Sequence, residues 1–224
     1  MNMYVARQPI FDRRQYVFGY ELLYRSGLDY IAPEINGAEA TAEVIVNSMV
    51  TLDLKSIARG KKAFIKFTRQ LLEEKTAYLF PPAALVVQIL EPFPNRAILD
   101  VCSGLKQKGY LIALDDIAKQ RYSEPLLQLA DIIKIDYQEI PSAERRSLIS
   151  ALKNFKAKLL ADKVETLEEY SDALEQGYTY FQGYFFCEPA IIEGKELSGS
   201  KLHNLQLIQE IYQPEMNIDR LETL

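Results

Sequence analysis

Residues 111–116 read Leu-Ile-Ala-Leu-Asp-Asp, an apolar run that stops at two carboxylates. The same pattern, a short apolar run that ends at an ionisable side chain, recurs along the chain. Its members are Tyr20 before Glu21, 63–65 before Lys66, 85–90 before Glu91, 111–114 before Asp115, 132–133 before Lys134 and 158–161 before Asp162. Near-continuous apolar runs are typical of parallel strands covered by helices on both faces. Functional side chains at the carboxyl ends of such strands are typical of the active face of a (β/α)-barrel.

Strand and helix patterns alternate through most of the chain. A pair of strands is expected at 4–11 and 16–24, joined by the polar turn 12–15. Helices are then expected over 38–52, 69–74, 94–108, 124–130, 142–155 and 166–176, and the eighth strand at 178–181. This alternation predicts an α/β fold with crossover helices, a TIM-like (β/α)8 barrel whose first strand is antiparallel.

The chain changes character after Pro189. Residues 194–200 are expected to form a polar connector, and 201–212 a C-terminal helix with one apolar side. We therefore expect a barrel domain over 1–195 and a helix and tail over 196–224. The tail is either a linker to a second domain or a terminal helix that packs on the barrel.

The bulk composition excludes several classes of protein. A net charge of −5 and a pI near 5.2 argue against a nucleic-acid binder, which usually carries a basic face. Two cysteines and no apolar leader near Met1 indicate the reducing cytoplasm, and no apolar stretch is long enough for a membrane helix. Only one histidine is present, so metal chemistry would use oxygen ligands and favour Mg²⁺, Mn²⁺ or Ca²⁺.

The acidic strand ends predict a cation site if the sheet brings them together. Several carboxylates in one pocket cannot all ionise without a cation between them. Such a site can make hydroxide from water and neutralise a phosphoryl transition state. Lys134 would add a fixed positive charge, and Arg25 could bind a phosphate with two hydrogen bonds. Alone, an Asp-Asp pair is usually a helix cap and Lys134 a salt bridge at the barrel rim, but their coincidence at successive strand ends favours a site.

The motifs, taken in order, resemble the EAL domain family of cyclic di-GMP phosphodiesterases. Glu21-Leu22-Leu23-Tyr24-Arg25 resembles the signature of that family. The other motifs that resemble it are Gln8-Pro9-Ile10, Glu91, Asp115-Asp116, Lys134-Ile135-Asp136, 161–166 (ADKVET) and Gln182-Gly183-Tyr184. Residues 5–11 and 39–45 are most similar to the branch in which an HDOD domain follows the EAL domain.

The resemblance implies hydrolysis of cyclic di-GMP to linear pGpG with Mg²⁺ or Mn²⁺. It also implies three kinds of role for individual residues: metal binding, catalysis and nucleotide contact. The metal ligands would be Glu21, Glu91, Asp115 and Asp116; the catalytic group Lys134, Asp162, Glu165 and Gln182; and the nucleotide contacts Gln8, Leu23, Arg25 and Asp116. Within the catalytic group, Lys134 would assist the nucleophilic water and Glu165 would hold the active-site loop.

Three departures from the family pattern argue against efficient hydrolysis. Lys66 stands where the family has a metal-binding asparagine, and at ~4 Å and an effective dielectric of about 20 its ammonium would repel a divalent ion by roughly 8 kcal/mol. Asp162 replaces a catalytic glutamate, and about 1 Å of lost reach can cost on the order of 100-fold in rate. Ala118 replaces a glycine in the loop after Asp116.

We therefore expect a degenerate EAL domain that acts by binding cyclic di-GMP, a protein partner, or both, with hydrolysis weak or absent and with no metal required. Lys66 would then replace the metal as a fixed cation. The first alternative is an active metal-dependent phosphodiesterase, and the second is a protein-interaction module without nucleotide affinity. A following HDOD domain and a homodimer are further expected partners.

Overall fold

The computed structural model of the chain describes residues 2–25, 54–90, 95–115, 117 and 122–195. The helices expected at 38–52 and 201–212 lie outside the described residues. So do Glu91, Asp116 and Ala118, and the side chain of Arg25 is likewise not described.

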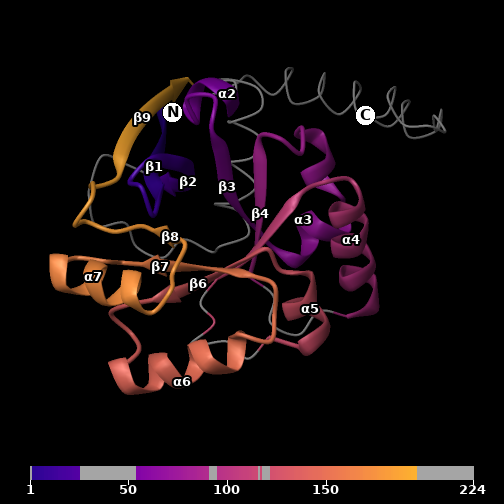
Figure 1. Cartoon of the computed structure of the whole chain (residues 1–224). Coiled ribbons are helices and arrows are strands. Elements are labelled where there is room, and N and C mark those ends of the chain that lie inside the picture. Colours follow the sequence, from indigo (N-terminus) through magenta and orange to yellow (C-terminus); the bar gives the residue numbers. More distant parts are fainter. Residues whose placement is uncertain (1, 26–53, 91–94, 116, 118–121, 196–224) are drawn as a thin grey trace, which may run out of the picture.

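Eight strands close into a barrel (Figure 1). They are β1 (Asn2–Asp12), β2 (Val17–Arg25), β3 (Lys62–Phe67), β4 (Leu85–Ile89), β5 (Leu111–Leu114), β6 (Ile132–Asp136), β7 (Lys158–Asp162) and β8 (Tyr180–Phe181). Neighbours from β2 to β8 run parallel, whereas β1 pairs antiparallel with both β2 and β8 and thereby closes the ring. The predicted barrel and its antiparallel first strand are confirmed.

The helices lie outside the strands and cover the barrel (Figure 1). They are α2 (Leu54–Ile57), α3 (Arg69–Glu73), the 3₁₀ helix η1 (Thr76–Leu79), α4 (Arg96–Gln107), α5 (Glu124–Leu129), α6 (Ser142–Leu152) and α7 (Leu167–Glu175). Five of the predicted helices are present with ends shifted by a few residues. Side-chain caps fix two of the starts: Asn95 accepts from the backbone N–H of Ile98, and Thr166 and Glu169 form a capping box on α7.

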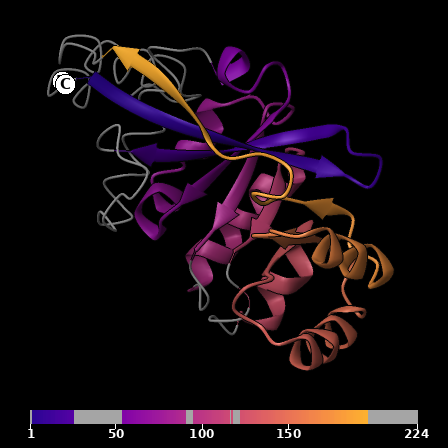
Figure 2. The same cartoon turned by 90° about the vertical axis from the view of Figure 1, so that its left-hand side faces the viewer.

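A ninth strand, β9 (Ala190–Lys195), pairs antiparallel with β1 and was not predicted (Figure 2). The prediction that a connector begins at Gly194 is wrong, because Gly194 and Lys195 pair with Met3 and Asn2. The reason is the length of β1, which pairs with β8 only at Phe11 and Asp12 and leaves the edge of its first half for another strand.

Inside the barrel, one buried apolar layer lies across the strands. Its members are Ile10, Phe64, Val86, Ala113, Ile132, Leu160 and Tyr180, from every barrel strand except β2. On β2 the corresponding residue is Gly19, where a Cβ would lie 2.7 Å from the backbone carbonyl oxygen of Lys62 and 2.9 Å from the Phe64 ring. Glycine is required here because the β3 backbone and the Phe64 ring fill that space. Burial of a side chain such as Phe64 contributes about 1.5–3 kcal/mol, so this layer fixes the relative positions of the strands.

A polar layer lies directly above the apolar one. Side chains alternate along a strand, so the residue two positions nearer the carboxyl end of each parallel strand faces the same interior. We call this set the polar tier: Gln8, Glu21, Lys66, Gln88, Asp115, Lys134, Asp162 and Gln182. Gln8 belongs to it from the antiparallel β1, where it pairs with Glu21. The barrel thus brings one polar residue from each of its strands to one end.

Candidate functional site

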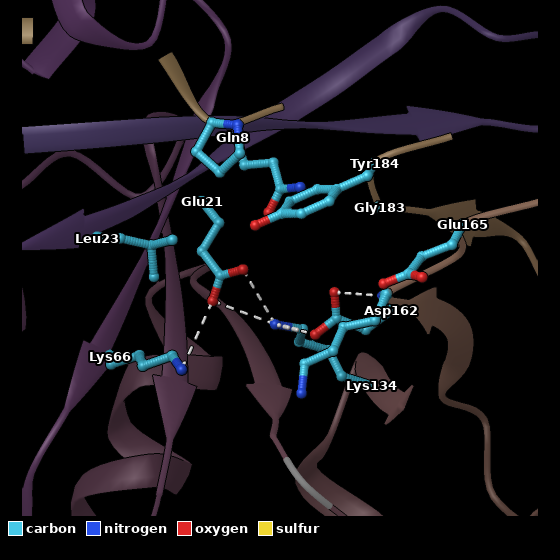
Figure 3. Close-up of a pocket in the computed structure, with 11 residues that line it drawn as sticks. Gln8, Glu21, Leu23, Lys66, Lys134, Asp162, Glu165, Gly183 and Tyr184 are labelled. Carbon is cyan, nitrogen blue, oxygen red and sulfur yellow. Dashed lines mark hydrogen bonds and ion pairs between the residues drawn. The ribbon is translucent and has the colours of Figure 1, made fainter. Parts of the chain in front are cut away.

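Lys134 is the centre of the polar tier. Its Nζ lies 3.1 Å from both Glu21 carboxylate oxygens and 3.1 Å from Asp162 Oδ2 (Figure 3), and 3.3 Å from Asp115 Oδ1. The side chain is only 2% exposed. Burial alone would lower the pKa of Lys134, but Asp115, Asp162 and Glu21 together hold it well above its usual range. Lys134 is therefore a buried cation shared by three acids from three strands.

Lys66 is the second cation of the tier, and its ammonium turns inward. Its Nζ lies 3.8 Å from Glu21 Oε1 (Figure 3) and 3.0 Å from Asp115 Oδ2. Burial disfavours the charge, yet Glu21 and Asp115 raise the pKa of Lys66 above its ordinary value. Unlike Lys134, Lys66 has a side chain that is 35% exposed. The ammonium of Lys66 therefore pairs with two acids, while about a third of its side chain remains exposed.

Two glutamines donate hydrogen bonds to Glu21, and a third glutamine accepts from one of them. Gln88 Nε2 donates to Glu21 Oε1 at 3.2 Å, and Gln182 Nε2 donates to Glu21 Oε2 at 2.6 Å. Gln182 Nε2 also donates to Gln8 Oε1 at 3.0 Å. In the described part of the chain, the buried Oε1 atoms of Gln88 and Gln182 have no hydrogen-bond partner. The tier thus holds neutral amides with spare acceptors beside its charged groups.

The three carboxyls of the tier differ in acidity. Burial disfavours the charge of each, but Lys134 and Lys66 lower the pKa of Glu21 and of Asp115 below the usual range. Asp162 contacts only Lys134 among the cations of the tier, and burial together with the nearby Glu21 and Asp115 charges raises its pKa to about 6. Two lysines therefore face three acids, and Asp162 is the one nearest to taking up a proton at neutral pH.

A pocket of about 270 Å³ opens above the tier. It is lined by Gln8, Glu21, Leu23, Lys66, Lys134, Asp162, Lys163, Glu165, Gly183, Tyr184 and Pro189 (Figure 3). Of the predicted site residues, Gln8, Glu21, Leu23, Lys134, Asp162 and Glu165 line the pocket. Asp115 and Gln182 are buried in the tier beneath it and contact its charged groups. The structure therefore brings together all the predicted site residues whose side chains it describes.

Sequence reasoning missed Gln88, the residue that β4 contributes to the tier. Gln88 is fully buried and lies in register with Lys66 on β3. Its signal was a single amide inside the apolar run 85–90. Lys163, Tyr184 and Pro189, which line the pocket from loops, were also not predicted.

The loop after β7 is held by hydrogen bonds from two sides. Val164 donates its N–H to the carbonyl of Gln182, and Lys163 Nζ lies 2.6 Å from Asp136 Oδ2. The Glu169 carboxylate accepts from the backbone N–H of Glu165 at 2.7 Å, as part of the cap of α7. This network fixes the loop that carries Asp162 and Glu165.

The described residues do not by themselves form a site for a divalent metal ion, and two of the predicted ligands, Glu91 and Asp116, lie outside them. Among the residues that the structure describes, no group of three or more His, Cys, Asp or Glu side chains is arranged to hold one. The ammonium of Lys66 lies between Glu21 and Asp115, where it supplies no lone pair. On the neighbouring strand, Gln88 adds no negative charge to offset that of a metal ion.

A closed barrel whose strand ends converge on ionisable side chains defines a class of (β/α)-barrel proteins with a site at one end. Within that class, the model of the EAL domain family matches residues 37–189, and the chain belongs to this family. No helix in the described residues is long and apolar enough to cross a membrane.

Two curated relatives are similar over 99% of this chain. The uncharacterized protein YuxH of Bacillus subtilis is 37% identical over 227 residues, which are 56% of its length. The cyclic di-GMP phosphodiesterase CdgJ of Vibrio cholerae is 34% identical over 225 residues, which are 52% of its length. The chain thus spans about half the length of these relatives.

Solved structures of EAL proteins share the fold. An EAL domain protein from Listeria monocytogenes superposes with a TM-score of 0.64 at 20% identity, covering 92% of this chain and 93% of that one. The YkuI protein of Bacillus subtilis, solved in complex with cyclic di-GMP and calcium, gives a TM-score of 0.64 at 22% identity, covering 98% and 63%.

Proposed function

We propose that this EAL domain acts in cyclic di-GMP signalling by binding the nucleotide, with hydrolysis weak or absent. The observation that carries the proposal is the position of the Lys66 ammonium, 3.0 Å from Asp115 and 3.8 Å from Glu21. Membership of the EAL family supports the nucleotide as ligand. The name of the relative CdgJ and the ligand of the YkuI structure point to the same ligand.

Lys66 is suited to hold a phosphate of the ligand. Its Nζ is fixed from one side by two acids, while a third of its side chain remains accessible from the pocket. An ammonium prepositioned in this way loses little entropy when a phosphate oxygen binds. Gln8, Leu23 and Arg25 would contact the rest of the nucleotide, as the family resemblance implies.

The tier offers little means to activate a water molecule. Lys134 stays protonated between its three acids, so it donates hydrogen bonds and cannot accept a proton. The acids Glu21 and Asp115 are weakened as bases because both lysines lower their pKa. Asp162 is the strongest base of the three, but its carboxylate is paired with Lys134. A bound metal ion would supply hydroxide at neutral pH, and the described residues do not by themselves form a site for one.

The test is titration calorimetry with cyclic di-GMP, in Mn²⁺ and in EDTA, combined with analysis of the product. We expect binding in both solutions and little linear pGpG. The substitution Lys66→Met should weaken binding, whereas Lys106→Met changes a lysine on α4 and should not. Turnover in Mn²⁺ that Glu21→Ala abolishes would overturn the proposal.

One observation favours the alternative of an active phosphodiesterase using Mg²⁺ or Mn²⁺. Glu21, Asp115 and Lys134 converge at one end of the barrel. In that case Lys66 would move aside when the metal binds, and the metal roles of Glu91 and Asp116 would apply. Absence of any binding heat for the nucleotide would instead favour a protein-interaction module.

The remaining assignments stay predictions. They are the division into 1–195 and 196–224, a following HDOD domain, a homodimer or other protein partner, and a cytoplasmic location. The length of the relatives is compatible with a further domain, since this chain spans about half of each.

A further inference from the structure

The wall of the pocket differs chemically from its base. The base is formed by charged groups of the polar tier. Lys134 pairs there with Asp115 and Asp162, and Lys66 also pairs with Asp115. Apolar and aromatic surface is contributed to the same pocket by Leu23, Tyr184 and Pro189, which we call the apolar rim. A ligand that fills both parts needs an anionic portion and a flat or apolar portion.

Tyr184 supplies a large, free ring to this rim. Its side chain is 58% exposed, and in the described part of the chain no other aromatic ring packs against it. Figure 3 shows the ring over the pocket beside Gln8, on the side away from Lys66 and Lys134. The neighbouring rings behave differently, because Phe185 stacks on Tyr170 and Phe186 packs on Phe181 and Phe11.

The backbone around Tyr184 is fixed before any ligand binds. Gly183 has a φ of 151°, and a Cβ there would lie 2.1 Å from the carbonyl oxygen of Val164. Phe185 donates its N–H to the same Val164 carbonyl, and Cys187 donates to the carbonyl of Gly183. The ring of Tyr184 is thus carried by a turn that the barrel holds on both sides. An aromatic ring that is exposed and prepositioned loses little conformational entropy on contact with a ligand.

We infer that Tyr184 is the base-stacking residue of this pocket and that it receives a guanine of the nucleotide whose phosphate lies at Lys66. This inference rests on the proposed function, because it assigns a part of the same ligand. Nucleobases stack on aromatic side chains irrespective of their hydrogen-bonding edge, with a contribution of about 1–3 kcal/mol per base. Tyr184 would therefore contribute affinity, while the charged base of the pocket would fix the phosphate.

The chain contains no tryptophan, which allows a direct optical test. Tyr184→Trp introduces one indole at the rim, and stacking with guanine should quench its fluorescence when cyclic di-GMP is added. The matched control is Tyr16→Trp. Tyr16 is 68% exposed and lies in the turn before β2, at the end of the barrel opposite the pocket. Its indole should show no change at the same nucleotide concentration.

Calorimetry with cyclic di-GMP supplies the second measurement. Tyr184→Ala should weaken binding about 5- to 150-fold, the range that corresponds to one base stack. Tyr184→Phe keeps the ring and should bind within about twofold of the unsubstituted chain. Circular dichroism of each variant checks that the fold is retained.

The outcomes separate this inference from the proposed function. Unchanged affinity in Tyr184→Ala, while the unsubstituted chain binds, overturns the stacking role and leaves the proposed function standing. Weakened binding without quenching in Tyr184→Trp also overturns stacking, because the residue would then act through the loop or through a partner surface. No binding by the unsubstituted chain overturns the proposed function and this inference with it.

Discussion

The two halves of the polar tier differ in how tightly they are built. On the β6–β8 side, Lys134 is 2% exposed and pairs with three acids, and the loop after β8 packs closely against Val164 at Gly183. On the β2–β4 side, Lys66 is 35% exposed and pairs with two acids. The enclosed half therefore fixes the geometry of the site, while the open half can change its chemistry at little cost to the fold.

The largest expected loss of stability follows a substitution in the enclosed half. Lys134→Met leaves three acids without their central cation, and loss of one partner from a buried ion pair costs about 3–5 kcal/mol. Lys66→Met removes a partly exposed cation and should cost about 1 kcal/mol. Urea unfolding followed by circular dichroism measures both. Equal losses in the two variants would contradict the division of the tier.

The backbone of the enclosed half gives the second prediction. In Gly183→Ala the new Cβ would lie 2.1 Å from Val164 O and 2.3 Å from Val164 N, so the loop must shift. We expect a loss of about 2–4 kcal/mol from the clash and the strained φ together.

Gly109→Ala is the matched control for that clash. Gly109 also has a positive φ, of 85°, but a Cβ there meets no atom within 4 Å. Its substitution should cost only the backbone strain, about 1–2 kcal/mol. Thermal unfolding of the two variants separates the clash from the strain, and similar losses would show that the close approach to Val164 is unimportant.

The same division explains how much of the site the sequence could predict. Strand ends such as Glu21, Asp115, Lys134 and Asp162 were recognisable because each apolar run stops at its functional residue. On β4 this rule points to Glu91, which lies outside the described residues and stays a prediction, whereas the described residue of β4 that faces the tier is Gln88, two positions beyond Val86 of the apolar layer. Which residue of a strand faces the polar tier depends on which residue of that strand belongs to the apolar layer. Only the register of the barrel strands determines this.

Long-range pairing limited the prediction of the fold in the same way. The strand β9 pairs with residues nearly the whole chain away, at the first half of β1. Its sequence, 190–195, contains two adjacent isoleucines followed by a glutamate, a glycine and a lysine, which is a weak strand signal. Residues 190–195 form a strand because they pair with the free edge of β1. That edge exists only in the folded barrel, so it cannot be recognised in the sequence of 190–195.

The open half gives a gain-of-binding prediction. Lys66→Asn combined with Gln88→Glu replaces a cation by an oxygen ligand and adds a third carboxylate beside Glu21 and Asp115. At a Mn²⁺ concentration about 100 times the dissociation constant, the double variant should gain about 2.7 kcal/mol in free energy of unfolding. Lys66→Asn alone should gain less, because Gln88 stays neutral.

Thermal unfolding in Mn²⁺ and in EDTA measures this gain. Lys66→Asn combined with Gln70→Glu is the control, since it changes the net charge equally but places the carboxylate on the exposed Gln70 of α3. A Mn²⁺ response as large in Lys66→Asn alone would show that Gln88 does not limit metal binding. An equal response in the unsubstituted chain would show that Lys66 does not exclude the metal.

The smallest expected effect depends on pH and concerns Asp162, where the two halves meet through Lys134. Burial raises the pKa of Asp162 to about 6, above its ordinary value of 3.8. The folded state thus favours the protonated acid, so its ionisation costs stability as the pH rises from about 4 through about 6, and the cost is complete above that range. The full cost of ionising Asp162 in the folded state would be about 3 kcal/mol of unfolding free energy.

The substitution Asp162→Asn removes this cost but also removes the ion pair with Lys134. We therefore expect it to stabilise the protein by only about 1–2 kcal/mol near pH 8 and by nothing near pH 4. Urea unfolding at both pH values measures this, with the exposed Asp100→Asn on α4 as control. A variant less stable than the unsubstituted chain at the higher pH would mean that the Asp162 carboxylate is needed to balance Lys134, and that the enclosed half is built around three charged acids.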